Sequence, residues 1–311
     1  MSSIAGAPEL RTKALPGITG QKIKGYVALT KPRIIELLLI TTVPTMFVAA
    51  KHLPSFALIC YTLLGGTLAA GGANAMNMIY DRDIDALMDR TKQRPLVTGI
   101  ITPQSATIFA VCLEVAAFFE LWRAVNLLSA VLAISATAFY VLVYTMWLKR
   151  STTQNIVIGG AAGAVPVLVG WSSVTNHVGV APFILFAIVF FWTPPHFWAL
   201  AVRYREDYQR ANIPMLPAVA EIDSVVTQII WYTVALDLLA LVFGVVAPYK
   251  GPEEIAYLVI AAILGAGFLQ RSWSLRSDPS PKNAMRLFTF SITYLTVLFV
   301  AMGTLGVIQH P

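Results

Sequence analysis

The 311-residue sequence predicts an all-α integral membrane protein in which nine transmembrane helices form a bundle around a central cavity. The composition is 57% hydrophobic and only 12% charged, and the mean hydropathy is +0.70, which lies outside the range of soluble globular proteins. Apolar runs of about twenty residues follow one another, and this is the length that a helix needs to cross a bilayer. The runs are continuous rather than alternating, so a membrane β-barrel is excluded.

The apolar runs place each helix between polar or proline-containing segments, and the shortest gaps fall near residues 122–128 and 249–254. Residues 1–25 are polar and are predicted to form a tail, which leaves one membrane domain over residues 26–311. The predicted spans are 26–50, 55–79, 104–123, 126–147, 153–175, 178–202, 224–248, 254–271 and 286–308.

Lysine and arginine residues gather on one side of the predicted membrane. They cluster in the tail as far as Arg33, in the 80–103 loop, and in segments that begin at Lys149, Arg203 and Arg271. The exceptions among the 22 basic residues are Lys51, Arg123 and Lys250. The positive-inside rule therefore places the tail and the basic loops in the cytoplasm or an equivalent compartment, and an odd number of spans places the C-terminus outside. The net charge of +6 follows the membrane in this way and does not indicate nucleic acid.

The motif that carries most chemical information begins where the second predicted helix ends. Asn77, Asp81 and Asp85 recur every four residues, so a helix places them one above another on one face. Unpaired carboxylates in such a row repel each other, but Mg²⁺ fits it, because Mg²⁺ takes oxygen ligands and bridges one or two carboxylates to a substrate phosphate. The candidates for holding the other phosphate oxygens are Arg90, Lys92 and Arg94.

A weaker copy of this pattern lies four helices later, at residues 203–210. It also ends a membrane helix and enters a proline-containing loop on the same side, so we interpret the bundle as two related four-helix halves plus a ninth helix. Asp207, beside Glu206, is a candidate ligand of a second Mg²⁺, and Arg203 is a candidate phosphate partner. The same pattern is also typical of a solvated helix end with snorkelling arginines.

A diphosphate held at a membrane face by Mg²⁺ and arginine indicates an allylic diphosphate whose hydrocarbon tail lies between helices. The cations neutralise the leaving diphosphate, so the allylic C–O bond can break toward a carbocation that the cavity must shield from water. The sequence contains no serine–histidine pairing and no reactive-cysteine context that would supply a nucleophile. The pattern therefore favours electrophilic transfer driven by a leaving group.

Several segments together resemble the UbiA-type intramembrane prenyltransferases, and most closely the subgroup that farnesylates haem. These segments are 29–34, 74–96, 144–150, 154–164, 192–198 and 207–217. The resemblance extends over nearly the whole chain from Gly25 onward. It implies Mg²⁺-dependent transfer of a farnesyl group from farnesyl diphosphate to a vinyl group of haem B, followed by water addition to give haem O. Haem B is then a substrate and not a cofactor.

The resemblance also implies roles for individual residues. Mg²⁺ and diphosphate are expected at Asn77, Asp81, Asp85 and Asp207, with Lys149 completing the catalytic set. The expected basic partners of the diphosphate are Arg90, Arg94, Lys149, Arg150 and Arg203. One departure concerns the second motif, because Arg203 stands where other members of the superfamily carry a carboxylate four residues before Asp207. The number of Mg²⁺ ions therefore stays open.

Two polar residues inside apolar segments are candidates for binding the acceptor. His196 is an intramembrane ionisable group, and such groups are functional candidates by default, here for iron ligation or a propionate contact. In a structural alternative, His196 bonds a backbone carbonyl freed by the neighbouring prolines. Asn74 lies one turn before Asn77, where it either orients Asn77, meets the acceptor, or makes a helix–helix hydrogen bond. Glu114 is the deepest acid and has no evident partner in the sequence.

Two other functions stay open. The first is a UbiA-type prenyltransferase that acts on an aromatic or quinone-precursor acid, against which Arg203 and the His196 segment argue. The second is a non-enzymatic haem carrier or transporter. The short tail lacks an Arg- and Ser-rich transit pattern, which favours a bacterial inner membrane over a mitochondrial one. Membrane lipid is the expected surrounding, and a haem A synthase or an oxidase-assembly protein is a candidate partner.

Overall fold

The computed structural model describes residues 17–247 and 249–308, and within this part the chain is helical and contains no strand. Eight helical stretches are long and apolar enough to cross a membrane. They are α3 (Phe56–Tyr80), α5 (Pro103–Ala124), α6 to α7 (Leu127–Ser151), α8 (Asn155–Thr175), α9 (Val180–Arg203), α12 (Ile222–Val246), α13 (Pro252–Ser277) and α14 (Pro281–Ile308). With α2 (Pro32–Ala50), these stretches make up the bundle, so the predicted all-α membrane fold is confirmed.

The first predicted span, 26–50, is divided in the structure into α1 (Gly17–Leu29) and α2. Lys31 adopts a left-handed conformation with φ of 50° at the break, and Pro32 opens the new helix. A proline disfavours the helical conformation in the residue before it, which explains why the helix ends here. Helix α1 also takes up residues 17–25, which were expected in the polar tail; residues 1–16 lie outside the described residues.

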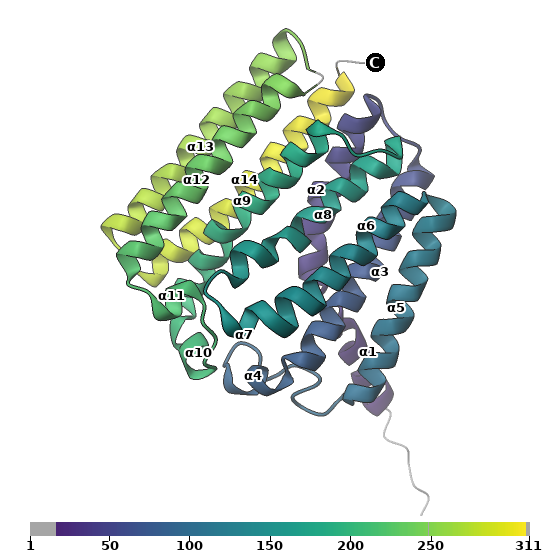
Figure 1. Cartoon of the computed structure of the whole chain (residues 1–311), viewed down its shortest axis with the longest axis vertical. Helices are drawn as coiled ribbons and strands as arrows, with labels where there is room; N and C mark the ends of the chain where they lie inside the picture. Colours follow the sequence, from purple (N-terminus) through teal and green to yellow (C-terminus); the bar gives the residue numbers. More distant parts are fainter. Residues whose placement is uncertain (1–16, 248, 309–311) are drawn as a thin grey trace, which may run out of the picture.

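Short helices gather at one end of the bundle. Helix α4 (Arg82–Leu87) follows α3, and α10 (Arg205–Arg210) and α11 (Leu216–Val219) follow α9. Figure 1 shows α4, α10 and α11 together at the end opposite to the one where α14 finishes. The two acidic stretches of the sequence therefore meet at one end of the bundle.

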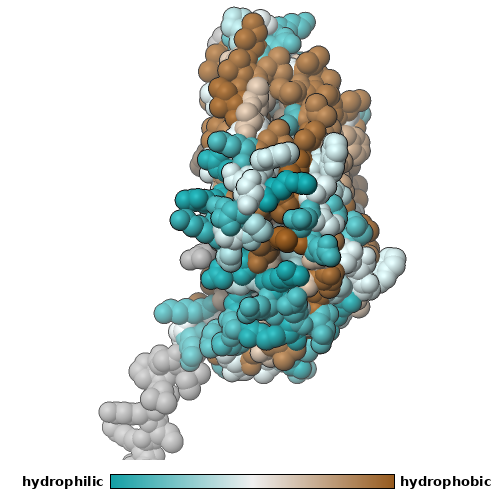
Figure 2. Space-filling model, turned by 90° about the vertical axis from the view of Figure 1, so that its left-hand side faces the viewer, coloured by the Kyte–Doolittle hydropathy of each residue, from teal (hydrophilic) through white to brown (hydrophobic). Residues whose placement is uncertain are grey.

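The surface agrees with a membrane-spanning bundle that has one polar end. Figure 2 shows hydrophobic residues over the upper part of the face near α12 and α13, and hydrophilic residues over the lower part. Exposed apolar side chains such as Trp231, Val245 and Ile263 belong to α12 and α13, as expected for lipid contact. The chain is a multi-pass membrane protein.

One membrane stretch is not uniformly α-helical. Helix α6 (Leu127–Ala138) continues into the π-helix η1 (Phe139–Leu148) and ends in the single turn α7 (Lys149–Ser151). The Thr145 hydroxyl donates to the Tyr140 carbonyl at 2.9 Å, and the Lys149 backbone N–H donates to the carbonyl of Tyr144. Both bonds join residues five apart, so the π-helix brings such residues toward one face.

Glycines allow helices to approach closely in this bundle. An ideal Cβ at Gly170 of α8 would lie 2.6 Å from the backbone oxygen of Thr42 in α2. A backbone atom cannot be moved aside as a flexible side chain can, so α2 and α8 depend on the missing Cβ.

We expect Gly170→Val to lower the free energy of unfolding by about 1–3 kcal/mol, because overpacking forces the two backbones apart. Thermal unfolding of the purified protein in detergent measures this change. Gly20→Ala is the control, because a Cβ at Gly20 meets no atom within 4 Å. Equal unfolding midpoints for Gly170→Val and the parent protein would contradict this account.

Candidate active site

The predicted row of Asn77, Asp81 and Asp85 is present and continues across the junction of α3 and α4. The backbone N–H of Asp81 donates to the carbonyl of Asn77 at 2.9 Å, and that of Asp85 donates to the carbonyl of Asp81 at 2.8 Å. The helical hydrogen-bond spacing is therefore kept although α3 ends at Tyr80. All three side chains are buried.

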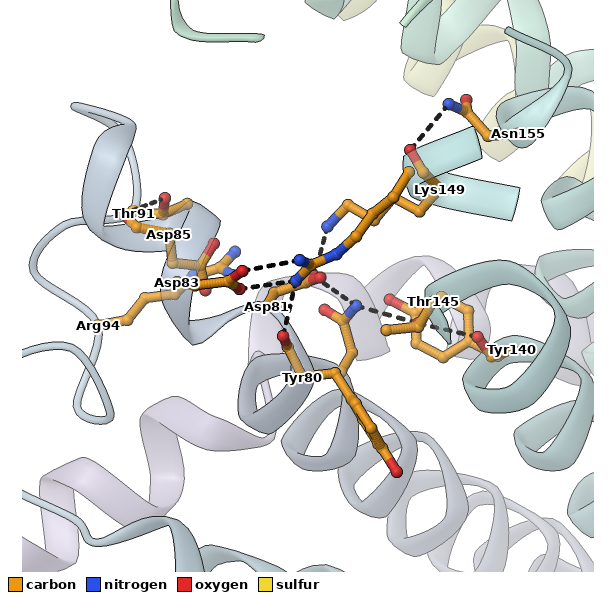
Figure 3. A network of polar contacts seen from close by, with 12 residues as sticks. Tyr80, Asp81, Asp83, Asp85, Thr91, Arg94, Tyr140, Thr145, Lys149 and Asn155 are labelled. Carbon is orange, nitrogen blue, oxygen red and sulfur yellow. Dashed lines mark hydrogen bonds and ion pairs between the residues drawn. The ribbon is translucent and has the colours of Figure 1, made fainter. Parts of the chain in front are cut away.

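Each carboxylate of the row has a basic partner from another part of the chain (Figure 3). Lys149 forms an ion pair with Asp81, which is fully buried. The guanidinium of Arg94 lies 2.5 Å from Oδ2 of Asp85. Because a buried charge is costly unless it is paired, these two contacts are what allow two carboxylates to sit at the end of an apolar bundle.

Asn77 connects the row to its neighbours. Its side-chain nitrogen donates to Oδ2 of Asp81 at 2.7 Å and to the hydroxyl of Thr145 at 3.1 Å. Its side-chain oxygen accepts a hydrogen bond of 2.8 Å from Nζ of Lys31. The amide is thus fixed with its oxygen toward a cation and its nitrogen toward a carboxylate.

Lys31 is a site residue that the sequence reasoning missed. It lies 46 residues from Asn77 along the chain and reaches it from the break between α1 and α2. Burial, together with the positive charges of Arg94 and Lys149, lowers the pKa of Lys31 to about 7. The basic pair Lys31 and Arg33 before the first membrane helix was a visible signal, but its spacing does not show that Lys31 meets Asn77.

Two of the predicted phosphate partners instead bind outer carboxylates. Arg150 pairs with Asp83 at 2.6 Å, and its hydrogen bond lowers the pKa of Asp83 to about 2. Lys92 pairs with Asp89 at 2.7 Å. Arg203 is exposed, with its guanidinium 5.7 Å from the ring centre of Tyr204. Their diphosphate-binding role stays a prediction.

The second acidic stretch contacts the first loop. Asp207 is buried, accepts a hydrogen bond of 3.4 Å from the backbone N–H of Arg90, and pairs with Arg210. Arg210 also pairs with Asp89 at 2.6 Å. The structure therefore brings Asp207 to the loop that follows Asp85. Asp207 stabilises this loop through its hydrogen bond with Arg90, and Arg210 does so through its ion pair with Asp89.

A cavity of about 350 Å³ extends from the row into the bundle between α2, α3, α6–η1, α8 and α9. Its polar end contains Lys31, Asn77, Asp85, Arg90, Arg94 and Lys149. Further in, small side chains dominate the wall: Gly66, Ala69, Ala70, Ala73, Ala133, Ala136, Gly159, Gly160 and Gly163. The stacked rings of Tyr140 and Tyr144, whose centres are 5.3 Å apart, line the cavity beside the polar end. This arrangement suits a ligand with a charged head and an apolar body.

The two predicted acceptor residues lie in different surroundings. Asn74 lines the cavity and donates to the carbonyl of Thr30 at 3.1 Å. This bond gives a partner to a backbone carbonyl that is left free just after α1 ends. His196 faces α14, where its ring stacks between Trp192 and Phe288 and Nδ1 lies 2.7 Å from the Ser291 hydroxyl. Trp192 lines the cavity, whereas His196 is not part of the lining. Haem binding by His196 stays a prediction.

The donor atoms of the row suit a hard cation. No group of three histidine, cysteine, aspartate or glutamate side chains is placed to hold an ion within residues 17–247 and 249–308. Asn77 supplies the third oxygen of the row, and Oδ1 of Asp81 is buried without a hydrogen-bond partner in this part of the chain. Two carboxylates and an amide beside basic side chains are the kind of donor set that would hold Mg²⁺ together with a phosphate.

The sequence matches the family model of the UbiA prenyltransferase family over residues 38–301. The chain belongs to the UbiA prenyltransferase family. Its relatives include proteins named protoheme IX farnesyltransferase. The protein from Frankia alni is 51% identical and covers 92% of this chain and 99% of its own length. The proteins from Streptomyces avermitilis and Synechocystis sp. are each 50% identical over 91% of this chain, and 94% and 89% of their own lengths.

Solved structures share the fold of this prenyltransferase at lower identity. A digeranylgeranylglyceryl phosphate synthase superposes with a TM-score of 0.74 at 16% identity, covering 92% of this chain and 99% of that one. A UbiA homologue from Archaeoglobus fulgidus bound to DMAPP and Mg²⁺ gives a TM-score of 0.67 at 20% identity, with coverages of 91% and 99%. These structures show that the chain has the UbiA fold. The family match and the relatives show that it is an enzyme of the prenyltransferase type.

For the prenyltransferase without ligands, we expect Asp85→Asn to lower the free energy of unfolding by about 3–5 kcal/mol, because it leaves Arg94 beside other cations without its buried partner. Asp89→Asn is the matched control. The Asp89 side chain is 60% exposed, and exposed ion pairs contribute little to stability because water screens them. Chemical unfolding of both variants gives the comparison, and equal losses would show that burial of the Arg94 pair does not matter.

Proposed function

We propose that this prenyltransferase moves a farnesyl group from farnesyl diphosphate to a vinyl group of haem B, with Mg²⁺ bound and with addition of water, to give haem O. One observation carries the proposal: Asn77, Asp81 and Asp85 meet Lys31, Lys149 and Arg94 at the polar end of the cavity. The haem acceptor is supported by relatives at about half identity over nearly the full length.

The polar end of the cavity fits the diphosphate. Lys31, Arg94 and Lys149 converge there from three separate segments, and all three line the cavity. Mg²⁺, when bound, supplies the charge that joins the carboxylates of the row to the diphosphate and stabilises the leaving group. Arg94 and Lys149 add positive charge where negative charge develops as the C–O bond breaks, and Lys31 donates a hydrogen bond from the same end of the cavity.

The apolar part of the cavity fits the farnesyl chain and the acceptor. Small residues on α3, α6 and α8 leave room, and the tyrosine pair with Trp192 supplies broad faces. Such a wall excludes bulk water, which a carbocation requires until the acceptor attacks. The new C–C bond then joins the farnesyl carbon to the end of the vinyl group, and water meets the resulting positive charge on the carbon beside the porphyrin ring.

The orientation in the membrane belongs to the same proposal. The relatives in Frankia, Streptomyces and Synechocystis are bacterial, which supports the inner membrane as the location. The basic residues at the α4 and α10 end support a cytoplasmic site, with the C-terminus outside. A haem A synthase or oxidase-assembly partner stays a prediction.

The decisive test incubates purified protein with haem B, farnesyl diphosphate and Mg²⁺ and measures the product mass. We expect the mass of haem O, and we expect it to disappear with EDTA and in Asp81→Asn, which lowers the charge of the row. Asp89→Asn should retain the product, because its exposed side chain lies outside the cavity lining. No haem product from folded protein would redirect the assay to aromatic acids, and haem binding without turnover would indicate a carrier.

Lys31 gives a second test of the diphosphate site. We expect Lys31→Met to lower kcat/KM for farnesyl diphosphate about 10- to 100-fold, the effect of losing one hydrogen bond to a charged group. Lys24→Met, in the preceding helix α1, is the control, because Lys24 is exposed and does not line the cavity. Unchanged kinetics in Lys31→Met would remove Lys31 from the site.

A further inference from the structure

Arg90 is the basic side chain of the cavity lining that stays outside the row beginning at Asn77. The other three, Lys31, Arg94 and Lys149, each contact a member of that row. Within residues 17–247 and 249–308, the guanidinium of Arg90 forms no ion pair. Arg90 is exposed, whereas the other three are half-buried. It therefore places a positive charge where the cavity opens, apart from the charges proposed for the diphosphate.

The ring of Tyr204 lies between Arg90 and a second arginine in the contact pattern of this end. The guanidinium carbons of Arg90 and Arg203 are each 5.7 Å from the ring centre, which is within the range of a cation–π contact. The two guanidiniums are therefore no more than twice that distance apart. Arg203 is exposed and, like Arg90, pairs with no carboxylate in the part of the chain that the structure describes. An anion beside both would relieve their repulsion and accept their hydrogen bonds.

Helix α9 connects the apolar wall of the cavity with this arginine pair. Trp192 and Phe197 line the cavity. Arg203 lies about three turns beyond Trp192, and Tyr204 lies about two turns beyond Phe197, so each falls on nearly the same face of α9 as its counterpart. A flat apolar ligand that packs against this face would therefore have its outer edge at Tyr204 and Arg203.

The acidic side chains in contact with the Arg90 loop already have cationic partners. The carboxylate of Asp207 accepts the backbone N–H of Arg90 and pairs with Arg210. Asp89 pairs with both Lys92 and Arg210. Their negative charge is balanced locally, so the guanidiniums of Arg90 and Arg203 keep their attraction for an incoming anion.

The proposed acceptor has anionic groups of its own. Haem B carries two propionate carboxylates on one edge of its flat ring and two vinyl groups on the opposite edge. Carboxylates are costly to bury in an apolar cavity, so the propionate edge belongs at the polar mouth. The vinyl edge then points into the cavity, below the row, where the allylic carbon leaves its diphosphate.

We propose that Arg90 and Arg203, with Tyr204 as their positioning residue, bind the propionate carboxylates of the haem acceptor. The assignment rests on the proposed function. It gives the two arginines a different anion from the diphosphate that the sequence resemblance implies, and it separates the two anion sites. The diphosphate meets Lys31, Arg94 and Lys149, whereas the propionates meet the planar guanidiniums, whose paired donors match a carboxylate.

The test measures binding of haem B and of its dimethyl ester, in which both propionates are uncharged, by quenching of tryptophan fluorescence in the full-length protein. We expect Arg90→Met and Arg203→Met each to weaken haem B binding about tenfold to a hundredfold, the effect of losing a hydrogen bond to a charged group. The dimethyl ester should bind the parent protein and both variants equally, because it has no carboxylate for the arginines to meet. The KM for farnesyl diphosphate should stay at the parent value.

The matched control is Arg205→Met, which removes one exposed positive charge from the same segment. Arg205 donates to the carbonyl of Ala220 and does not line the cavity, so this variant should bind haem B like the parent protein. Two further variants test the positioning role of Tyr204. Tyr204→Leu should weaken haem B binding, whereas Tyr204→Phe keeps the ring and should retain it.

The other outcomes also decide the assignment. Parent-like affinity for haem B in Arg203→Met overturns it, and so does an equal loss for haem B and the ester, because the propionates would then not be the groups bound. A higher KM for farnesyl diphosphate with unchanged haem affinity would return both arginines to the diphosphate. Arg203 is exposed, so Arg203→Met decides alone if Arg90→Met does not fold. A parent protein that binds haem B but forms no haem O would reject the proposed function, while the same titrations still decide the propionate site.

Discussion

Two buried ion pairs, Asp81 with Lys149 and Asp85 with Arg94, are the interactions on which the rest of the site depends. Carboxylates stacked at the end of an apolar bundle repel each other and lose their hydration, so each requires a cation at close range. The cations, Lys149 and Arg94, come from other segments of the chain, and the loop that follows α4 is shaped by the need to bring Arg94 to Asp85. The loop after α4 turns back so that Arg94 reaches Asp85, and the Thr91 hydroxyl holds this turn by donating to the Asp85 carbonyl at 3.0 Å. In the proposed function the same charges bind a diphosphate, because the groups that balance a carboxylate also bind phosphate.

The π-helix η1 is the second requirement of this arrangement. In an α-helix, residues five apart point in different directions, but the π-helical spacing brings them toward one face. Tyr144 and Lys149 are related in this way, and both line the cavity. Thr145, on the same π-helix, holds Asn77 at 3.1 Å. The π-helix thus places the Tyr144 ring, the Lys149 amine and the Thr145 hydroxyl, which contacts Asn77, on the side of the cavity. π-Helical turns frequently occur at functional sites.

The sequence predicts those parts of the site that depend on local spacing. The row of Asn77, Asp81 and Asp85 follows from helical periodicity, and the structure contains it. Contacts between distant segments could not be predicted in this way. Lys31 reaches Asn77 only because the chain breaks before Pro32, and Arg150 turns to Asp83 because of how α7 is placed beside α4. Which way His196 points likewise depends on how α9 is rotated against α14, where His196 meets Ser291. The segment is apolar on all sides, so its sequence pattern does not determine that rotation.

The two acidic stretches have different roles in the structure, and this difference bears on Arg203, the residue at which the sequence departs from the superfamily pattern. Asp207 receives the backbone N–H of Arg90 and the side chain of Arg210, and Arg210 in turn reaches Asp89. The second stretch therefore holds the first loop across the polar end of the cavity. Tyr208, the neighbour of Asp207, lines the cavity, so these contacts are joined directly to the cavity wall. Position 203 takes no part in these contacts, so a carboxylate there is not needed to hold the loop, and the arginine instead adds positive charge at this end of the bundle.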